Sequence, residues 1–161
     1  MREEDCIALL RRTGCSEGVI AHCRAVRDLA LTYASDPLVD RDLVETGALL
    51  HDIGRGVTHD LCHAEAGGEI CRMFGLDEAV AAIVERHIGA GLTADECSLL
   101  GLIPRDCMPR TLEEKIVAHA DNLVKGTRAI TLEERMQHAI ALPKKQRRRI
   151  WRLMQEMELF R

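Results

Sequence analysis

The chain contains 161 residues, of which 47% are hydrophobic and 2% are aromatic, and it carries a formal net charge of −4. This length is enough for one domain with a full core, and a core made mainly of aliphatic side chains favours helices over strands. The negative charge argues against broad binding to nucleic acids or anionic membranes as the main role.

The cysteines and apolar residues indicate a cytoplasmic protein. The seven cysteines form no Cys-x-x-Cys pair, and an odd number does not fit a disulfide framework. Residues 1–5 lack the apolar core of a signal peptide, and no apolar run approaches the roughly 18 residues of a membrane span. We therefore expect a reduced, cytoplasmic protein with free thiols and no membrane contact.

Apolar periodicity and turn residues divide the first half of the chain into helices. Ser16 is a typical N-cap, while Gly14, Asp36-Pro37 and Gly54 are typical of helix ends. The predicted helices cover about residues 3–12, 16–35, 40–54, 63–74 and 77–87, with a polar loop at 55–62.

Three threonines in the second half begin segments with the sequence of a capping box, a typical helix start. They are Thr93, Thr111 and Thr131, each followed three residues later by a glutamate. A last helix is predicted to begin near Pro143, since proline is tolerated in the first turn. The chain is therefore predicted to be an all-α, single-domain helical bundle over residues 1–161, with about eight helices and no strand.

An adjacent His51-Asp52 pair lies at the polar end of an apolar helical stretch. His51 continues the apolar stripe of its helix, so its ring should point inward, where an unpaired polar group is costly. His22, His87 and Asp121 likewise lie on or beside apolar stripes. A shared divalent metal ion would satisfy all these groups at once, because imidazole and carboxylate are both good metal ligands.

The candidate ligands suffice for one or two ions. One ion would be held by His22, His51, Asp52 and Asp121, and a second by His63 and His87 with Asp52 as the bridge. Ions in such a site lower the pKa of a water molecule and stabilise the attacking and leaving oxygens of a phosphoryl transfer.

The ordered set of His22, His51-Asp52 within His-Asp-Ile-Gly, and Asp121 resembles the HD superfamily of metal-dependent phosphohydrolases, over about residues 16–128. His63 and His87 resemble the additional ligands of its two-metal branch, which includes diadenosine tetraphosphate hydrolases and cyclic-dinucleotide phosphodiesterases. The adjacent histidines and the Gly-Tyr-Pro signature found in cyclic-dinucleotide enzymes are absent. The resemblance implies iron or manganese, and the ligand types alone would also accept zinc or nickel.

The predicted function is that of a phosphoric ester hydrolase, in which metal-bound hydroxide attacks a small nucleotide-like or cyclic phosphoester. A pterin cyclic phosphate, as used by an archaeal HD enzyme, is one specific option. Asp52 is predicted to be catalytic through the ions, and Arg55 and Lys125 by neutralising phosphate charge. Lys125 is placed one turn beyond Asp121 on the same helix face. The predicted substrate-binding residues are Arg55, His59, His119, Lys125 and Arg128.

Two other functions fit the same residues. A few HD proteins are di-iron oxygenases, and a protein with this fold could also be a nucleotide sensor without turnover. In each case the expected partner is a small phosphorylated molecule or cofactor rather than a nucleic acid, and a homo-oligomer is possible. The basic run at 144–152 is interpreted as a solvated helix face, with an RNA or oligomer contact as the alternative.

Overall fold

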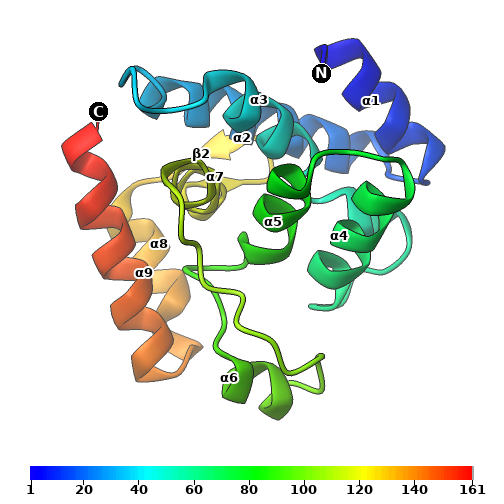
Figure 1. Ribbon diagram of the computed structural model, residues 1–161. Coiled ribbons are helices and arrows are strands. Elements are labelled where there is room, and N and C mark those ends of the chain that lie inside the picture. Colours follow the sequence, from blue (N-terminus) through cyan, green and yellow to red (C-terminus); the bar gives the residue numbers. More distant parts are fainter. Residues whose placement is uncertain (161) are drawn as a thin grey trace.

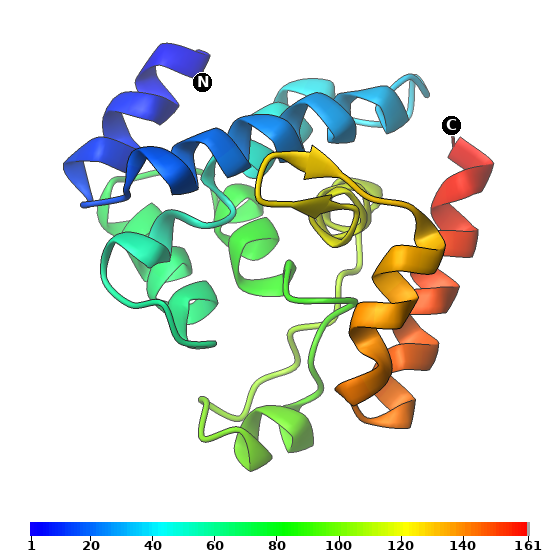
Figure 2. The ribbon, with the colours of Figure 1, turned by 180° about the vertical axis from the view of Figure 1, so that it is seen from behind.

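The computed structural model describes residues 1–160, and its regular secondary structure is almost entirely helical. Within that range there are nine α-helices, three short 3₁₀ helices and one two-stranded hairpin (Figures 1 and 2). No helix in this range is both long and apolar enough to cross a membrane. The α-helices are α1 (Glu3–Arg12), α2 (Glu17–Tyr33), α3 (Arg41–Leu50), α4 (His63–Met73), α5 (Glu78–Arg86), α6 (Ala94–Leu99), α7 (Leu112–Asn122), α8 (Leu132–His138) and α9 (Lys144–Met157).

Capping side chains set the starts of the helices that carry the site. The side chains of Ser16, Asp40 and Asp77 accept hydrogen bonds from the first turns of α2, α3 and α5 respectively. The helix predicted at 40–54 is shorter than expected, since α3 ends at Leu50 and a 3₁₀ turn, Ile53–Gly56, follows. His51 and Asp52 therefore lie in the connection between α3 and the 3₁₀ turn.

Two large groups of buried apolar side chains hold most of the helices together, and a third, small group includes Cys97 of α6. The larger group joins α2, α3, α5, α7 and α9, and the other joins α1 to α5. In both views α6 projects at the end of the molecule opposite to α2, while α8 and α9 lie together on one flank (Figures 1 and 2).

The prediction that the chain has no strand is wrong at one point. Val124–Lys125 (β1) pairs with Arg128–Ala129 (β2) in an antiparallel hairpin, which packs against α2. Its turn contains Gly126 with a φ of 63°, a left-handed conformation that glycine adopts without a Cβ penalty. The chain therefore leaves α7 at Asn122 and turns back beneath α2 (Figure 2).

Two of the three predicted capping boxes are complete, at Thr93 and Thr131. At Thr111 the side chain accepts from the N–H of Glu114, but the Glu114 carboxylate does not return the bond. It instead accepts from Arg86 Nη1 at 2.7 Å and from the N–H of Arg110 at 2.6 Å. Glu114 therefore joins α7 to α5 rather than closing its own helix end.

Replacing Glu114 with alanine should lower the stability of the fold. Its side chain is 5% exposed and that of Arg86 is 22% exposed, so the substitution leaves a partly buried cation unpaired. We expect a loss of about 3 kcal/mol in the free energy of unfolding, the lower end of the range for breaking a buried pair. Urea denaturation measures it. The matched control is Glu69→Ala, on an exposed position of α4, and an equal effect of both variants would contradict the assignment.

Candidate metal centre

The predicted metal ligands converge from five helices, α2, α3, α4, α5 and α7. His22 lies inside α2, and His51 and Asp52 directly follow α3. His63 is the first residue of α4, His87 directly follows α5, and Asp121 lies in the last turn of α7.

Asp52 lies at the centre of this cluster, and its two carboxylate oxygens face different histidines. Oδ1 lies 3.1 Å from His63 Nε2 and 3.6 Å from His87 Nε2. Oδ2 lies 3.9 Å from His22 Nε2 and 3.8 Å from His51 Nε2. Such a carboxylate can bridge two ions, each with its own pair of imidazoles.

Asp121 completes the first of these two groups. Its Oδ1 lies 3.0 Å from His22 Nε2 and 3.5 Å from His51 Nε2. The potential ligand atoms of His22, His51 and Asp121 are close enough to share one cation, and so are those of His51, Asp52 and His87.

All four imidazoles turn the same nitrogen, Nε2, toward the cluster. Each Nδ1 lies within hydrogen-bonding distance of a backbone carbonyl, and a carbonyl can only accept, so Nδ1 must carry the proton. In the neutral ring this leaves the Nε2 lone pair available for a metal. The Nδ1 partners are Gly126 O at 2.8 Å for His22, Ala48 O at 2.8 Å for His51, Asp60 O at 2.7 Å for His63 and Val84 O at 2.7 Å for His87.

Several polar groups at the centre lack a partner in the described part of the chain, and a cation would supply one. His51 Nε2 and Asp52 Oδ1 are buried without a hydrogen-bond partner among the described residues. His63 Nε2 and His87 Nε2 lie 3.2 Å apart, so two lone pairs face each other when both rings are neutral. Neutral imidazoles with two ionised carboxylates carry a charge of −2, of which the Arg55 guanidinium beside Asp52 Oδ2 offsets one. The residues present therefore fit a divalent metal.

The pKa shifts of Asp52, Asp121 and His87 agree with this, while the raised pKa of His51 favours a proton that a bound cation would displace. Burial acts to raise the pKa of Asp52, but the surrounding imidazoles, above all His51, hold it well below its usual range. The pKa of Asp121 is lowered against the same effect of burial, mainly by its bond to His22. Burial lowers the pKa of His87, which favours the neutral ligand form. The pKa of His51 is raised despite burial, because the Asp52 carboxylate attracts positive charge. Both carboxylates are thus ionised and favour a cation between them.

Gly54 explains how α4 comes close enough to bring His63 to Asp52. A Cβ at Gly54 would lie 1.9 Å from the carbonyl oxygen of His63 and 2.8 Å from the N–H nitrogen of Gly67. Only a residue without a side chain allows α4 to pack here. The glycine in His-Asp-Ile-Gly thus has a packing role.

An open pocket of about 570 Å³ lies over the metal centre. Of the predicted substrate-binding residues, Arg55 and Lys125 line it. Arg55 Nε donates to Asp52 Oδ2 at 2.9 Å, and its guanidinium also binds the His59 carbonyl. Lys125 does not share a helix face with Asp121 as predicted, because it lies in β1, where its Nζ is 3.2 Å from His138 Nε2.

Three predicted substrate-binding residues do not line this pocket. His119 is fully buried, and its ring packs edge-on against Tyr33 at a centroid distance of 4.7 Å, so the prediction of substrate contact is wrong. A residue two positions before Asp121 faces another side of the helix. His59 is exposed in the loop before α4, and the exposed Arg128 is paired with Glu134 in α8.

The pocket also contains polar residues that sequence reasoning missed. Arg135 and His138 reach it from α8, and Asn122 from the end of α7. Arg135 Nε donates to Asn122 Oδ1 at 2.7 Å. No sequence motif marks these residues, because the hairpin and α8 bring them to the site through tertiary packing.

The HD domain family model matches residues 19–126, and the chain belongs to this family. The predicted resemblance is therefore confirmed. The fold agrees, since the HD domain of the L. monocytogenes phosphodiesterase PgpH, solved with cyclic-di-AMP, superposes with a TM-score of 0.58. That match covers 91% of this chain and 93% of the PgpH domain at 17% sequence identity.

Curated relatives extend the similarity beyond the family motif. "Uncharacterized protein MJ0778" of Methanocaldococcus jannaschii is 48% identical over 139 residues, which cover 83% of this chain and 82% of that protein. A tRNA (cytidine(56)-2'-O)-methyltransferase of Thermoplasma volcanium is 45% identical over 132 residues. Ribonuclease Y of Acidothermus cellulolyticus is 31% identical over 117 residues. The matches span only 39% and 21% of the length of these last two proteins.

Proposed function

We propose that this chain is a metal-dependent phosphoesterase that hydrolyses a small nucleotide-like phosphoester or cyclic phosphodiester. The observation that carries the proposal is the arrangement around Asp52, where each carboxylate oxygen faces its own pair of inward-turned imidazoles. The proposed ligands of one or two divalent ions, with iron or manganese favoured, are His22, His51, Asp52, His63, His87 and Asp121.

When bound, the ions lower the pKa of a water molecule and draw charge from the phosphoryl oxygens. Arg55 holds Asp52 through its Nε and keeps the carboxylate oriented toward the imidazoles. Lys125 and Arg135 provide positive charge on the pocket wall, where it offsets the negative charge of a bound phosphate. The pocket is open, so a phosphate group can enter from solvent.

Metal analysis and a substrate screen test this function together. The purified chain should contain iron, manganese or another divalent transition metal, and it should hydrolyse at least one nucleotide-like phosphoester under anaerobic conditions. The screen uses mono-, cyclic and dinucleotides. Short RNA is included because the relatives include ribonuclease Y and a tRNA methyltransferase.

Two outcomes would replace the proposal. Turnover that requires dioxygen, with no anaerobic hydrolysis, would identify an oxygenase on the same ligands. Tight nucleotide binding without turnover under any divalent metal would identify a sensor.

A further inference from the structure

A second and mainly apolar cavity adjoins the metal pocket. Its volume is about 270 Å³, near the lower end of the roughly 300–1,000 Å³ typical of ligand pockets. The two hollows share Gly89 and Arg135 in their linings, so they meet at these residues. Its apolar wall is formed by Leu61, Ile88, Leu92, Leu100, Leu142 and Ile150.

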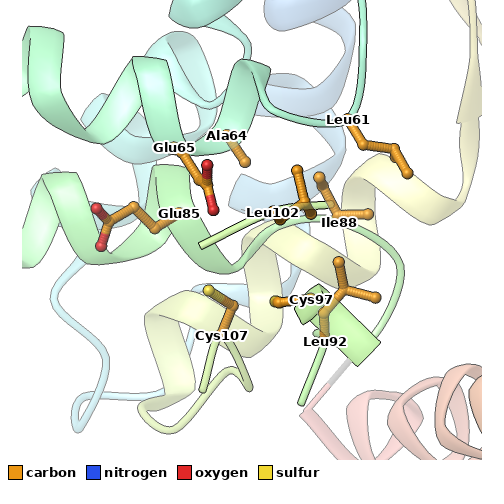
Figure 3. Close-up of a pocket in the computed structure, with 9 residues that line it drawn as sticks. All are labelled: Leu61, Ala64, Glu65, Glu85, Ile88, Leu92, Cys97, Leu102 and Cys107. Carbon is orange, nitrogen blue, oxygen red and sulfur yellow. The ribbon is translucent and has the colours of Figure 1, made fainter. Parts of the chain in front are cut away.

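Part of this wall is visible in Figure 3. Leu61 lies before α4, and Ile88 and Leu92 lie in the segment after α5. The same three side chains also line the narrower hollow drawn there, which continues toward Cys97 and Cys107. Apolar side chains from segments distant in sequence therefore form one surface beside the metal centre.

Arg135 is fixed at the junction of the two hollows. Its Nε donates to Asn122 Oδ1 at 2.7 Å, and Asn122 Nδ2 donates in turn to the carbonyls of Gly89 at 2.6 Å and Ala118 at 2.8 Å. No described residue hydrogen-bonds the terminal guanidinium nitrogens of Arg135. Those nitrogens can bind an anionic group whose organic part extends into the apolar side.

Gln146, in the first turn of α9, is the other polar side chain on the lining of the cavity. It is half-buried, and no hydrogen bond of its amide is formed within residues 1–160. An amide offers donors and an acceptor together, the combination that pairs with the edge of a heterocyclic base. A plain hydrocarbon chain would have no use for this group.

We propose that this cavity binds the nucleobase of a nucleoside phosphoester whose phosphate lies at the metal centre. The inference rests on the proposed function and adds the part of the substrate that distinguishes one phosphoester from another. The aliphatic walls cover the faces of the base, Gln146 meets its polar edge, and Arg135 lies where the ribose phosphate crosses from one hollow to the other. The same chemistry occurs in a free nucleotide and at an RNA terminus.

Equilibrium binding measures this subsite without turnover. Isothermal titration with Mn²⁺ present compares AMP with inorganic phosphate on the full chain, in the wild type and in Gln146→Trp. We expect AMP to bind at least about tenfold more tightly than phosphate, because its base buries apolar surface. Gln146→Trp fills the cavity and should weaken AMP about tenfold while changing phosphate affinity less than about twofold. The matched control is Gln155→Trp, at an exposed position of the same helix, which should change neither affinity.

Equal affinity of the wild type for AMP and phosphate would overturn the subsite, as would an unchanged preference in a folded Gln146→Trp. Tighter binding of hexyl phosphate than of AMP would replace the nucleobase with an alkyl group. An adenosine-ended trinucleotide then distinguishes a free nucleotide from an RNA terminus as the natural ligand. It binds as tightly as AMP only if an RNA terminus fits the cavity.

Failure of the nucleobase subsite can be distinguished from failure of the proposed hydrolase function. If AMP preference is present and lost in Gln146→Trp, but no phosphoester is hydrolysed with any metal, the hydrolase proposal fails and the subsite stands. If bis(p-nitrophenyl) phosphate and adenosine 2′,3′-cyclic phosphate are both hydrolysed without AMP preference, the subsite fails and the hydrolase stands.

Discussion

Replacing Asp52 with alanine is expected to abolish metal binding and hydrolysis together. Both carboxylate oxygens of Asp52 face imidazole Nε2 atoms, so its removal takes a ligand from each of the two groups. Loss of a residue that merely supports a ligand typically costs roughly 10–100-fold in metal affinity or activity, and loss of the ligand itself should cost at least about 100-fold. Elemental analysis and the phosphoester assay measure the two effects on one sample.

The control for this variant is Asp42→Ala, at an exposed position of α3, the helix that leads to His51. It should keep both metal and activity. Far-ultraviolet circular dichroism should show the same helix content in both variants. An Asp52→Ala protein that retains its metal would remove this residue from the ligand set.

Gly54→Ala is expected to damage the second ligand group through the backbone. The added Cβ would lie 1.9 Å from the His63 carbonyl oxygen, so α4 must move away and take the His63 ring with it. We expect a loss of about 1–3 kcal/mol in stability, as for other overpacked cores. If two ions bind, the metal content should fall by about one ion per chain, because the His63–His87 side opens.

Gly18→Ala provides the matched comparison. Gly18 is also in a helix, α2, and its Cβ would meet only Ser16 Oγ, at 3.7 Å. That change should leave stability equal or raise it by up to about 1 kcal/mol, since alanine is the better helix former. Gly54→Ala with unchanged melting temperature and metal content would contradict the packing role.

The convergence of the proposed metal ligands could be predicted from the sequence because each one lies in or beside an apolar helical stripe. His51 continues the buried face of α3, and His87 follows the buried face of α5, so helical periodicity alone places both rings inside. The order of His22, His51-Asp52 and Asp121 along the chain then indicated the HD family. The all-α fold was predictable for the same reason, since the apolar stripes and the N-caps mark most helices directly.

The pocket wall was not predictable in this way. Lys125 was placed on a continued α7, but Lys125-Gly126-Thr127-Arg128 forms a hairpin instead. A glycine in the first of two loop positions is a recognised hairpin signal, and it could have been used here. Arg135 offers no comparable signal, because it reaches the site only through the path of the hairpin and the packing of α8.

Three of the histidines bind a carbonyl three residues earlier in the chain: His51 to Ala48, His63 to Asp60 and His87 to Val84. The main chain itself therefore dictates the angle of each ring. The rotational freedom of these rings is lost when the polypeptide folds, not when a cation arrives. The centre is preorganised, so exchanging one ion for another requires little rearrangement of the rings.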